Sequence, residues 1–199
     1  MGQISVKTYV TPGSLLSGNL QFGGIIAFVS SAQQVFVDEF GAGRRFTLLF
    51  AICAGAMGFA SFVNSRVVER LGTRLISQSA ILALIAISLL HVIVIFAGAE
   101  TLTSYILLQA LSMTCIGLCG SNFGAMTMKP VGHIAGTASS VQGLITSIGA
   151  VLVGSAIGQS YSGTTLPLAI GYLCIGLSVL AIVYHVERGQ LFHPSIVAL

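Results

Sequence analysis

Charged residues are rare in this chain, and they divide it into long uncharged stretches. These stretches separate Lys7 from Asp38, Arg45 from Arg66, Arg74 from Glu100, Glu100 from Lys129, and Lys129 from Glu187. Each of the first four stretches can hold one membrane-spanning helix of about 20 residues, and the fifth can hold two. The fifth stretch is interrupted at 158–165 by a polar, turn-rich segment. The spacing of the charges therefore predicts six transmembrane helices.

The composition requires lipid around most of the surface. Hydrophobic residues make up 55% of the chain and charged residues 7%, whereas soluble domains carry about 25% charged residues. Uncharged runs such as 81–96 lack the strict alternation of membrane β-strands, which favours helices. We expect an all-α integral membrane protein with a transmembrane domain at 15–185, between short cytoplasmic segments at 1–14 and 186–199. The expected spans are 15–37, 46–64, 75–97, 102–126, 137–157 and 166–185.

The basic residues predict how the chain is oriented in the membrane. With six spans, both termini lie on one side, and that side carries Lys7, Arg66, Arg70, Arg74, Lys129 and Arg188. The opposite side has only Arg44 and Arg45. Because short loops rich in Lys and Arg stay in the cytoplasm, we expect both termini to be cytoplasmic.

The six spans differ in polarity. The third and sixth are almost uniformly apolar, whereas the first, fourth and fifth carry most of the amide and hydroxyl side chains. An amide in hydrocarbon costs free energy unless it is hydrogen bonded. These three spans are therefore expected to line an interior, either a seam between helices or an aqueous path. Hydrogen bonds between packed helices remain the alternative explanation for any single amide.

Glycines recur along the fourth and fifth spans at spacings that place them on one helix face. Small residues at such spacings let two helix backbones approach closely. We expect a helix-packing role for Gly117, Gly120, Gly124, Gly143, Gly154 and Gly158.

Several kinds of chemistry are not expected. The four histidines and four cysteines show no metal-ligand spacing, and no phosphate-binding glycine loop is present. The pattern of a serine nucleophile elbow is also missing, so we expect neither an enzyme nor a cofactor. The titratable residue well inside a span is His91, which we expect to be structural or at the lipid interface rather than a proton relay.

A first family resemblance comes from the segment Asn64-Ser-Arg-Val-Val-Glu-Arg-Leu-Gly-Thr-Arg74. It resembles the signature loop of the major facilitator superfamily, with Glu69, Arg70, Gly72 and Arg74 at the matching positions. Gly72 permits a tight turn. Glu69 could pair with neighbouring arginines at the cytoplasmic surface, although anchoring by positive charge explains the segment equally well.

A second resemblance lies in residues 120–165, which are similar to the region of helices ten and eleven in drug:proton antiporters of the Bcr/CflA-like branch. Segments 30–34 and 187–192 also resemble that branch, and Lys129 stands where its members often have an acidic residue. Members have twelve helices in two six-helix halves. The resemblance implies that this chain is the C-terminal half, with its first, fourth and fifth spans at the cavity.

The resemblance implies export of small, mostly apolar compounds across the bacterial inner membrane by proton-coupled alternating access. The substrate cavity candidates, chosen by helix and depth, are Phe28, Ser30, Gln33, Gln34, Gln109, Asn122 and Gln142.

Transport then requires a partner, either a missing N-terminal six-helix half or a second copy. In the family, the acidic residues that couple transport to protons usually belong to the first half. Two alternatives to a half-transporter remain: a homodimeric small-molecule permease, and a membrane scaffold or subunit that does not transport. The mild basic balance implies no nucleic-acid partner.

Overall fold

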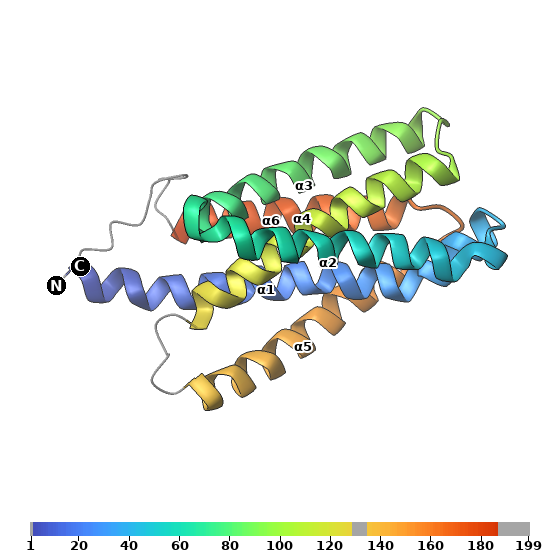
Figure 1. Ribbon diagram of the computed structural model, residues 1–199. Helices are drawn as coiled ribbons and strands as arrows, with labels where there is room; N and C mark the ends of the chain where they lie inside the picture. Colours follow the sequence, from blue (N-terminus) through green and yellow to red (C-terminus); the bar gives the residue numbers. More distant parts are fainter. Residues whose placement is uncertain (1, 129–134, 187–199) are drawn as a thin grey trace.

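The computed structural model describes residues 2–128 and 135–186, with side chains at 13–128 and 136–186. Lys129 and the expected C-terminal tail from residue 187 lie outside the described residues. The helices are α1 (Gly2–Gln33), η1 (Gln34–Glu39), η2 (Gly43–Arg45), α2 (Phe46–Leu71), α3 (Thr73–Phe96), α4 (Leu102–Met128), α5 (Ala135–Gln159) and α6 (Leu166–Val186). No strand occurs in the described ranges, so the predicted all-α bundle is confirmed (Figure 1).

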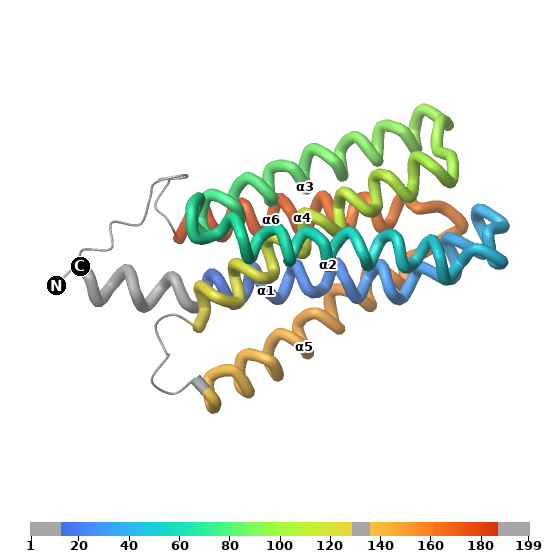
Figure 2. The backbone as a smooth tube through the Cα atoms, in the orientation of Figure 1, coloured from blue at the N-terminus to red at the C-terminus, as the bar shows by residue number. Residues whose placement is uncertain are grey.

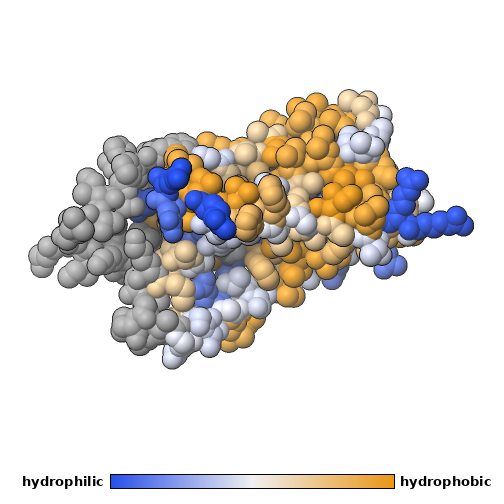
Figure 3. All heavy atoms as spheres, in the orientation of Figure 1, coloured by the Kyte–Doolittle hydropathy of each residue, from blue (hydrophilic) through white to orange (hydrophobic). Residues whose placement is uncertain are grey.

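Six of these helical segments are long and apolar enough to cross a membrane. Their apolar parts run through Gly13–Glu39, Gly43–Leu71, Thr73–Phe96, Leu102–Met128, Gly136–Gln159 and Leu166–Val186. Hydrophobic side chains cover much of the middle of the visible face, and the strongly hydrophilic ones gather toward its ends (Figure 3). This distribution is typical of a multi-pass membrane protein, in which lipid rather than water contacts the apolar middle of the surface.

Helix α4 is central to the bundle. It packs along α1, α2 and α3, while α6 packs against α3 and α1. Helix α5 diverges from the others and is held almost entirely by α1 (Figure 1). As a result α2 and α5 are the least buried spans, with 17% of the apolar window of each buried inside the bundle.

The two ends of the described chain lie at the same end of the bundle. A side chain on Gly13 would contact Val186, because the start of the first span and the end of α6 are adjacent (Figure 2). Helices α2 and α3 connect at that end through Gly72 alone, whose φ of +80° fits a residue without Cβ. The predicted loop at 64–74 is thus mostly helical, because α2 continues to Leu71.

The opposite end of the bundle holds the connections between α1 and α2, α3 and α4, and α5 and α6 (Figure 2). Helix α4 begins there with a reciprocal cap. The backbone N–H of Ser104 donates to Thr101 Oγ1, and the backbone N–H of Thr101 donates to Ser104 Oγ. Such a pair satisfies backbone donors that a helix start leaves free.

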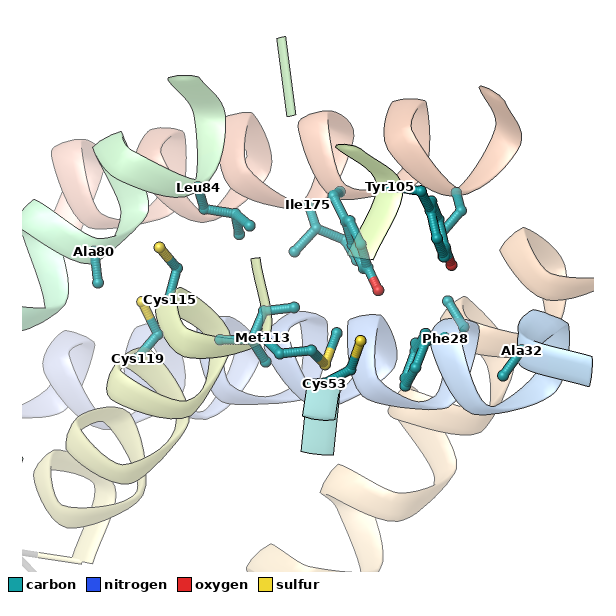
Figure 4. Close-up of a cluster of buried hydrophobic side chains, with 14 of the residues drawn as sticks. Phe28, Ala32, Cys53, Ala80, Leu84, Tyr105, Met113, Cys115, Cys119 and Ile175 are labelled. Carbon is teal, nitrogen blue, oxygen red and sulfur yellow. The ribbon is translucent and has the colours of Figure 1, made fainter. Parts of the chain in front are cut away.

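The buried core joins aromatic and aliphatic side chains from several helices (Figure 4). The Phe28 ring of α1 stacks on Phe50 of α2 with 5.3 Å between centroids. The edge of the Phe36 ring meets Tyr105 of α4 at 5.6 Å. Cys115 and Cys119 of α4 are buried in the same cluster as free thiols, which is where small apolar residues belong.

Close helix contacts involve some of the predicted glycines. A Cβ on Gly154 or Gly158 would meet atoms of α1 at 2.5 Å and 2.7 Å, so these residues let α5 dock on α1. Gly117 is equally close to Met57 of α2, at 2.8 Å. Around Gly120 and Gly143 there is open space within 4 Å.

Candidate functional site

A cavity of about 270 Å³ opens among α1, α2, α4 and α5. Helices α2 and α5 make no extensive contact with each other, so the cavity stays open between them. The residues that line it are Leu15, Gly18, Gln21, Phe22, Ile25, Met57, Ser61, Ile116, Gly117, Gly120, Ser121, Gly124, Gln142 and Thr146.

The lining combines apolar walls with a few polar groups. The polar side chains are Gln21, Ser61, Ser121, Gln142 and Thr146, which come from all four helices. Apolar walls with a small number of hydrogen-bonding groups are typical of sites for small organic molecules.

Gln21 is the most unusual residue of the lining. Its side chain is fully buried, and neither atom of its amide has a hydrogen-bond partner within the described part of the chain. A buried amide without a partner costs about 1–3 kcal/mol. Both amide atoms are also shielded from solvent, so Gln21 borders the cavity with an unpaired amide that its neighbours cover.

The glycines of α4 leave the room that the cavity occupies. Gly117, Gly120 and Gly124 follow one another at spacings of three and four residues, so they share one helix face. All three line the cavity. The glycine face that the sequence predicts for helix packing therefore contacts α2 at Gly117 and borders open space at Gly120.

The structure distributes the seven cavity candidates over three environments. Gln142 lines the cavity and is partly exposed. Phe28, Gln109 and Asn122 are buried inside the bundle. The remaining three are exposed toward the end of the bundle opposite the termini, Ser30 and Gln33 in α1 and Gln34 at the start of η1.

Two of the buried candidates form hydrogen bonds between helices. Asn122 of α4 and Asn64 of α2 exchange amide hydrogen bonds of 3.1 Å and 3.3 Å. Gln109 of α4 donates to the Tyr172 hydroxyl of α6 at 2.8 Å. These amides connect packed helices, the alternative that remained open for single amides.

The sequence analysis did not select Gln21, Ser61, Ser121 or Thr146 as cavity candidates. Gln21 belongs to the polar set of the first span, but its unpaired state depends on neighbours from other helices. Ser61 comes from α2, which the polarity comparison did not place at the cavity. These residues are recognisable only from the packing of the four helices.

The residues of the family-like loop motif lie at the end of the bundle that holds the termini. Glu69 and Arg70 are exposed in the last turn of α2, and Arg74 is partly buried in the first turn of α3. Gly72 separates the two helices.

His91 lies in a polar cluster at the other end. Its side chain is 1% exposed, and its Nε2 is 2.8 Å from Oε1 of Glu100. Of the two positions expected for His91, structural or at the lipid interface, the burial of the side chain supports the structural one. Its partner lies in the connection after α3, nine residues along the chain.

A comparison with curated proteins found a bicyclomycin resistance protein homolog of Haemophilus influenzae (strain ATCC 51907 / DSM 11121 / KW20 / Rd). The two sequences are 26% identical over 187 residues, which cover 88% of this chain and 44% of the relative. The chain thus spans less than half the length of this relative. No family model matches the chain, and no solved structure matches it.

Proposed function

We propose that this chain is one six-helix half of a proton-coupled drug-efflux permease of the major facilitator superfamily, in the Bcr/CflA-like branch. The observation that carries the proposal is the cavity that opens between α2 and α5. The similarity to a resistance protein about twice as long supports both the transport class and the need for further helices.

The substrates are small, mostly apolar compounds. Aliphatic and aromatic side chains hold such compounds with little directional preference, and the partly exposed amide of Gln142 adds a polar contact. Alternating access means that one half rocks against the other, so that a site near the middle of the membrane opens first to the cytoplasm and then to the outside.

The exposed faces of α2 and α5 support a covering partner. Both helices expose large apolar side chains, among them Phe59 and Phe62 on α2 and Leu144 and Ile148 on α5. A second six-helix half that packed over α2 and α5 would cover apolar surface and close the cavity between them. A second copy of this chain is the alternative partner. Crosslinking in native membranes distinguishes the two partners, because a homodimer gives a band at twice the mass of the chain that contains no other protein.

The orientation of the chain in the membrane is part of the same proposal. The chain lies in the bacterial inner membrane, with the end that holds Gly13 and Val186 in the cytoplasm. The end near Arg44, Arg45 and Glu100 then faces outside.

Replacing Gly120 by phenylalanine should abolish efflux. The change places a large ring in the open space beside Gly120, so the substrate loses its room while the backbone contacts of the bundle stay. The measurement is the accumulation of a lipophilic fluorescent dye in cells whose chromosomal copy of the gene has been deleted and which carry the variant. Accumulation should equal that of the deletion strain.

The matched control is Ala86→Phe, which adds the same ring at an exposed position of α3. This variant should restore efflux to the level of the unchanged protein. If Gly120→Phe also restores efflux at equal protein amounts, the cavity does not hold the substrate. If neither variant nor the unchanged chain alters dye accumulation, the non-transporting scaffold gains support.

A further inference from the structure

The polar side chains that are accessible from the cavity come from α2, α4 and α5. Ser61 belongs to α2, Ser121 to α4, and Gln142 and Thr146 to α5. These side chains are exposed or partly exposed, whereas both amide atoms of Gln21 are covered by its neighbours. A compound in the cavity can therefore form hydrogen bonds with the two serines, with Gln142 and with Thr146.

The two serines of the cavity already donate their hydroxyl hydrogens within their own helices. Ser61 Oγ donates to the backbone oxygen of Met57 at 3.1 Å, and Ser121 Oγ donates to that of Gly117 at 2.9 Å. A carbonyl oxygen can only accept, so each serine hydrogen points toward it. The lone pairs of each Oγ remain available, and a bound compound can use them only by donating an N–H or O–H group.

Gln142 extends from α5 toward the wall of the cavity that α4 provides. Its Nε2 lies 4.0 Å from the position that a Cβ on Gly124 would take, and Gly124 follows Ser121 by three residues on α4. Thr146 follows Gln142 by four residues, so the two share one face of α5. Neither side chain has a hydrogen-bond partner among the described residues. Their oxygens add further acceptors to the cavity.

The lining of the cavity is uncharged. Among the residues that the structure describes, no Asp, Glu, Lys, Arg or His lines it. An ion that leaves water for such a site costs far more free energy than a neutral group does, unless a counterion pairs with it. The cavity wall of this half therefore disfavours charged compounds, whereas a neutral compound enters without that cost.

We propose that this half recognises neutral compounds that carry an N–H or O–H donor, and that Ser61 and Ser121 are the specificity-determining acceptors. The assignment rests on the proposed function in taking the cavity as the substrate site, and it names the class of substrate. The apolar walls hold the body of the compound, and the serine oxygens accept its donor. A related compound without a donor keeps the apolar contacts and binds more weakly.

The test is the binding of three coumarin dyes to the purified full chain in phosphatidylcholine nanodiscs, measured by equilibrium dialysis against empty nanodiscs. An aminocoumarin is neutral and donates N–H, its N,N-dimethyl derivative is neutral without a donor, and its trimethylammonium derivative is a cation. The aminocoumarin should bind about fivefold more tightly than the dimethyl derivative, which is the usual contribution of one hydrogen bond. The cation should bind about tenfold more weakly than the dimethyl derivative, or weaker still.

The double variant Ser61→Ala/Ser121→Ala should bind the aminocoumarin only as tightly as the dimethyl derivative. Its unchanged affinity for the dimethyl derivative shows that it has folded. Ser160→Ala is the matched control, because exposed Ser160 of α5 also donates to a backbone oxygen four residues earlier but does not line the cavity. This variant should keep the preference for the aminocoumarin. Gly120→Phe, which fills the open space of the cavity, should abolish binding of both neutral dyes.

Equal affinities of the unchanged chain for the two neutral dyes overturn the proposal, as does a preference that survives in the double variant. Binding that survives Gly120→Phe, tight binding of the cation, or no binding of any dye also contradicts it. If the variants fail to fold, the three affinities of the unchanged chain decide. The measurement involves no transport. Unselective binding therefore leaves the efflux proposal standing, and a lack of efflux in cells leaves selective binding standing.

Discussion

Replacing Gly154 by alanine should loosen α5 from the bundle and destabilise the protein by about 1–3 kcal/mol, the usual cost of overpacking a close contact. The new Cβ would lie 2.5 Å from Cβ of Ile26 and 2.7 Å from the backbone oxygen of Gly23. A backbone oxygen cannot move aside without a shift of the whole helix. Since α5 is held almost entirely by α1, no other contact offsets the loss. The measurement is reversible unfolding in mixed micelles.

Gly143→Ala is the matched control on the same helix. Its Cβ meets nothing within 4 Å, so this variant should unfold like the unchanged protein or slightly later, because alanine favours helix more than glycine does. Equal destabilisation by the two variants would mean that α5 does not dock on α1 through Gly154.

The second large effect is expected at the amide pair between α2 and α4. Asn122→Leu leaves the Asn64 amide buried without its partner, which costs about 1–3 kcal/mol. Replacing both residues by leucine should cost less than the sum of the two single changes, because no unpaired amide remains. Unfolding of the two single variants and the double variant under the same conditions measures this coupling.

Gln33→Leu provides the comparison for the amide pair. It removes an amide that is exposed at the far end of α1, so it should cause no loss of stability. Strictly additive effects of Asn64→Leu and Asn122→Leu would show that the two amides act independently, contrary to the hydrogen bonds between them.

The number and type of the helices could be predicted because hydropathy is a local property. Charge spacing separates five uncharged stretches, the polar segment at 158–165 divides the last of them in two, and lipid imposes a length on each resulting span. The ends were harder to predict. The stretch from Asn64 to Leu71 contains charges typical of a loop, yet it continues α2, because charged side chains at a helix end can extend beyond the membrane while the backbone stays hydrogen bonded.

The cavity was only partly predictable. The polarity of the first, fourth and fifth spans pointed to three of its four walls, while α2 contributes mainly Met57 and Ser61. Whether an amide lines a cavity or pairs across helices depends on a residue far along the chain. Asn122 finds Asn64 at a separation of 58 residues and Gln109 finds Tyr172 at 63, whereas Gln21 finds no partner in the described chain.

The cluster at Glu100 shows the same limit in a different way. His91 stands alone in an apolar span by sequence, and Glu100 stands at a span end. The hydrogen bonds of Glu100 with His91 and Thr165 depend on how the end of α3, the connection after it and the start of α6 converge. Thr165 lies 65 residues from the carboxylate that it binds, so no local pattern could reveal the group.

The central claim is that this chain is one half of a transporter and requires a partner half. The direct measurement is proton-driven uptake of a lipophilic dye into liposomes that contain the purified chain, with an inward or outward pH gradient. The account predicts no uptake above that of empty liposomes from the chain alone, and uptake when a complementary six-helix half is reconstituted with it. Proton-coupled uptake by the chain alone would contradict the claim and would favour the homodimeric permease.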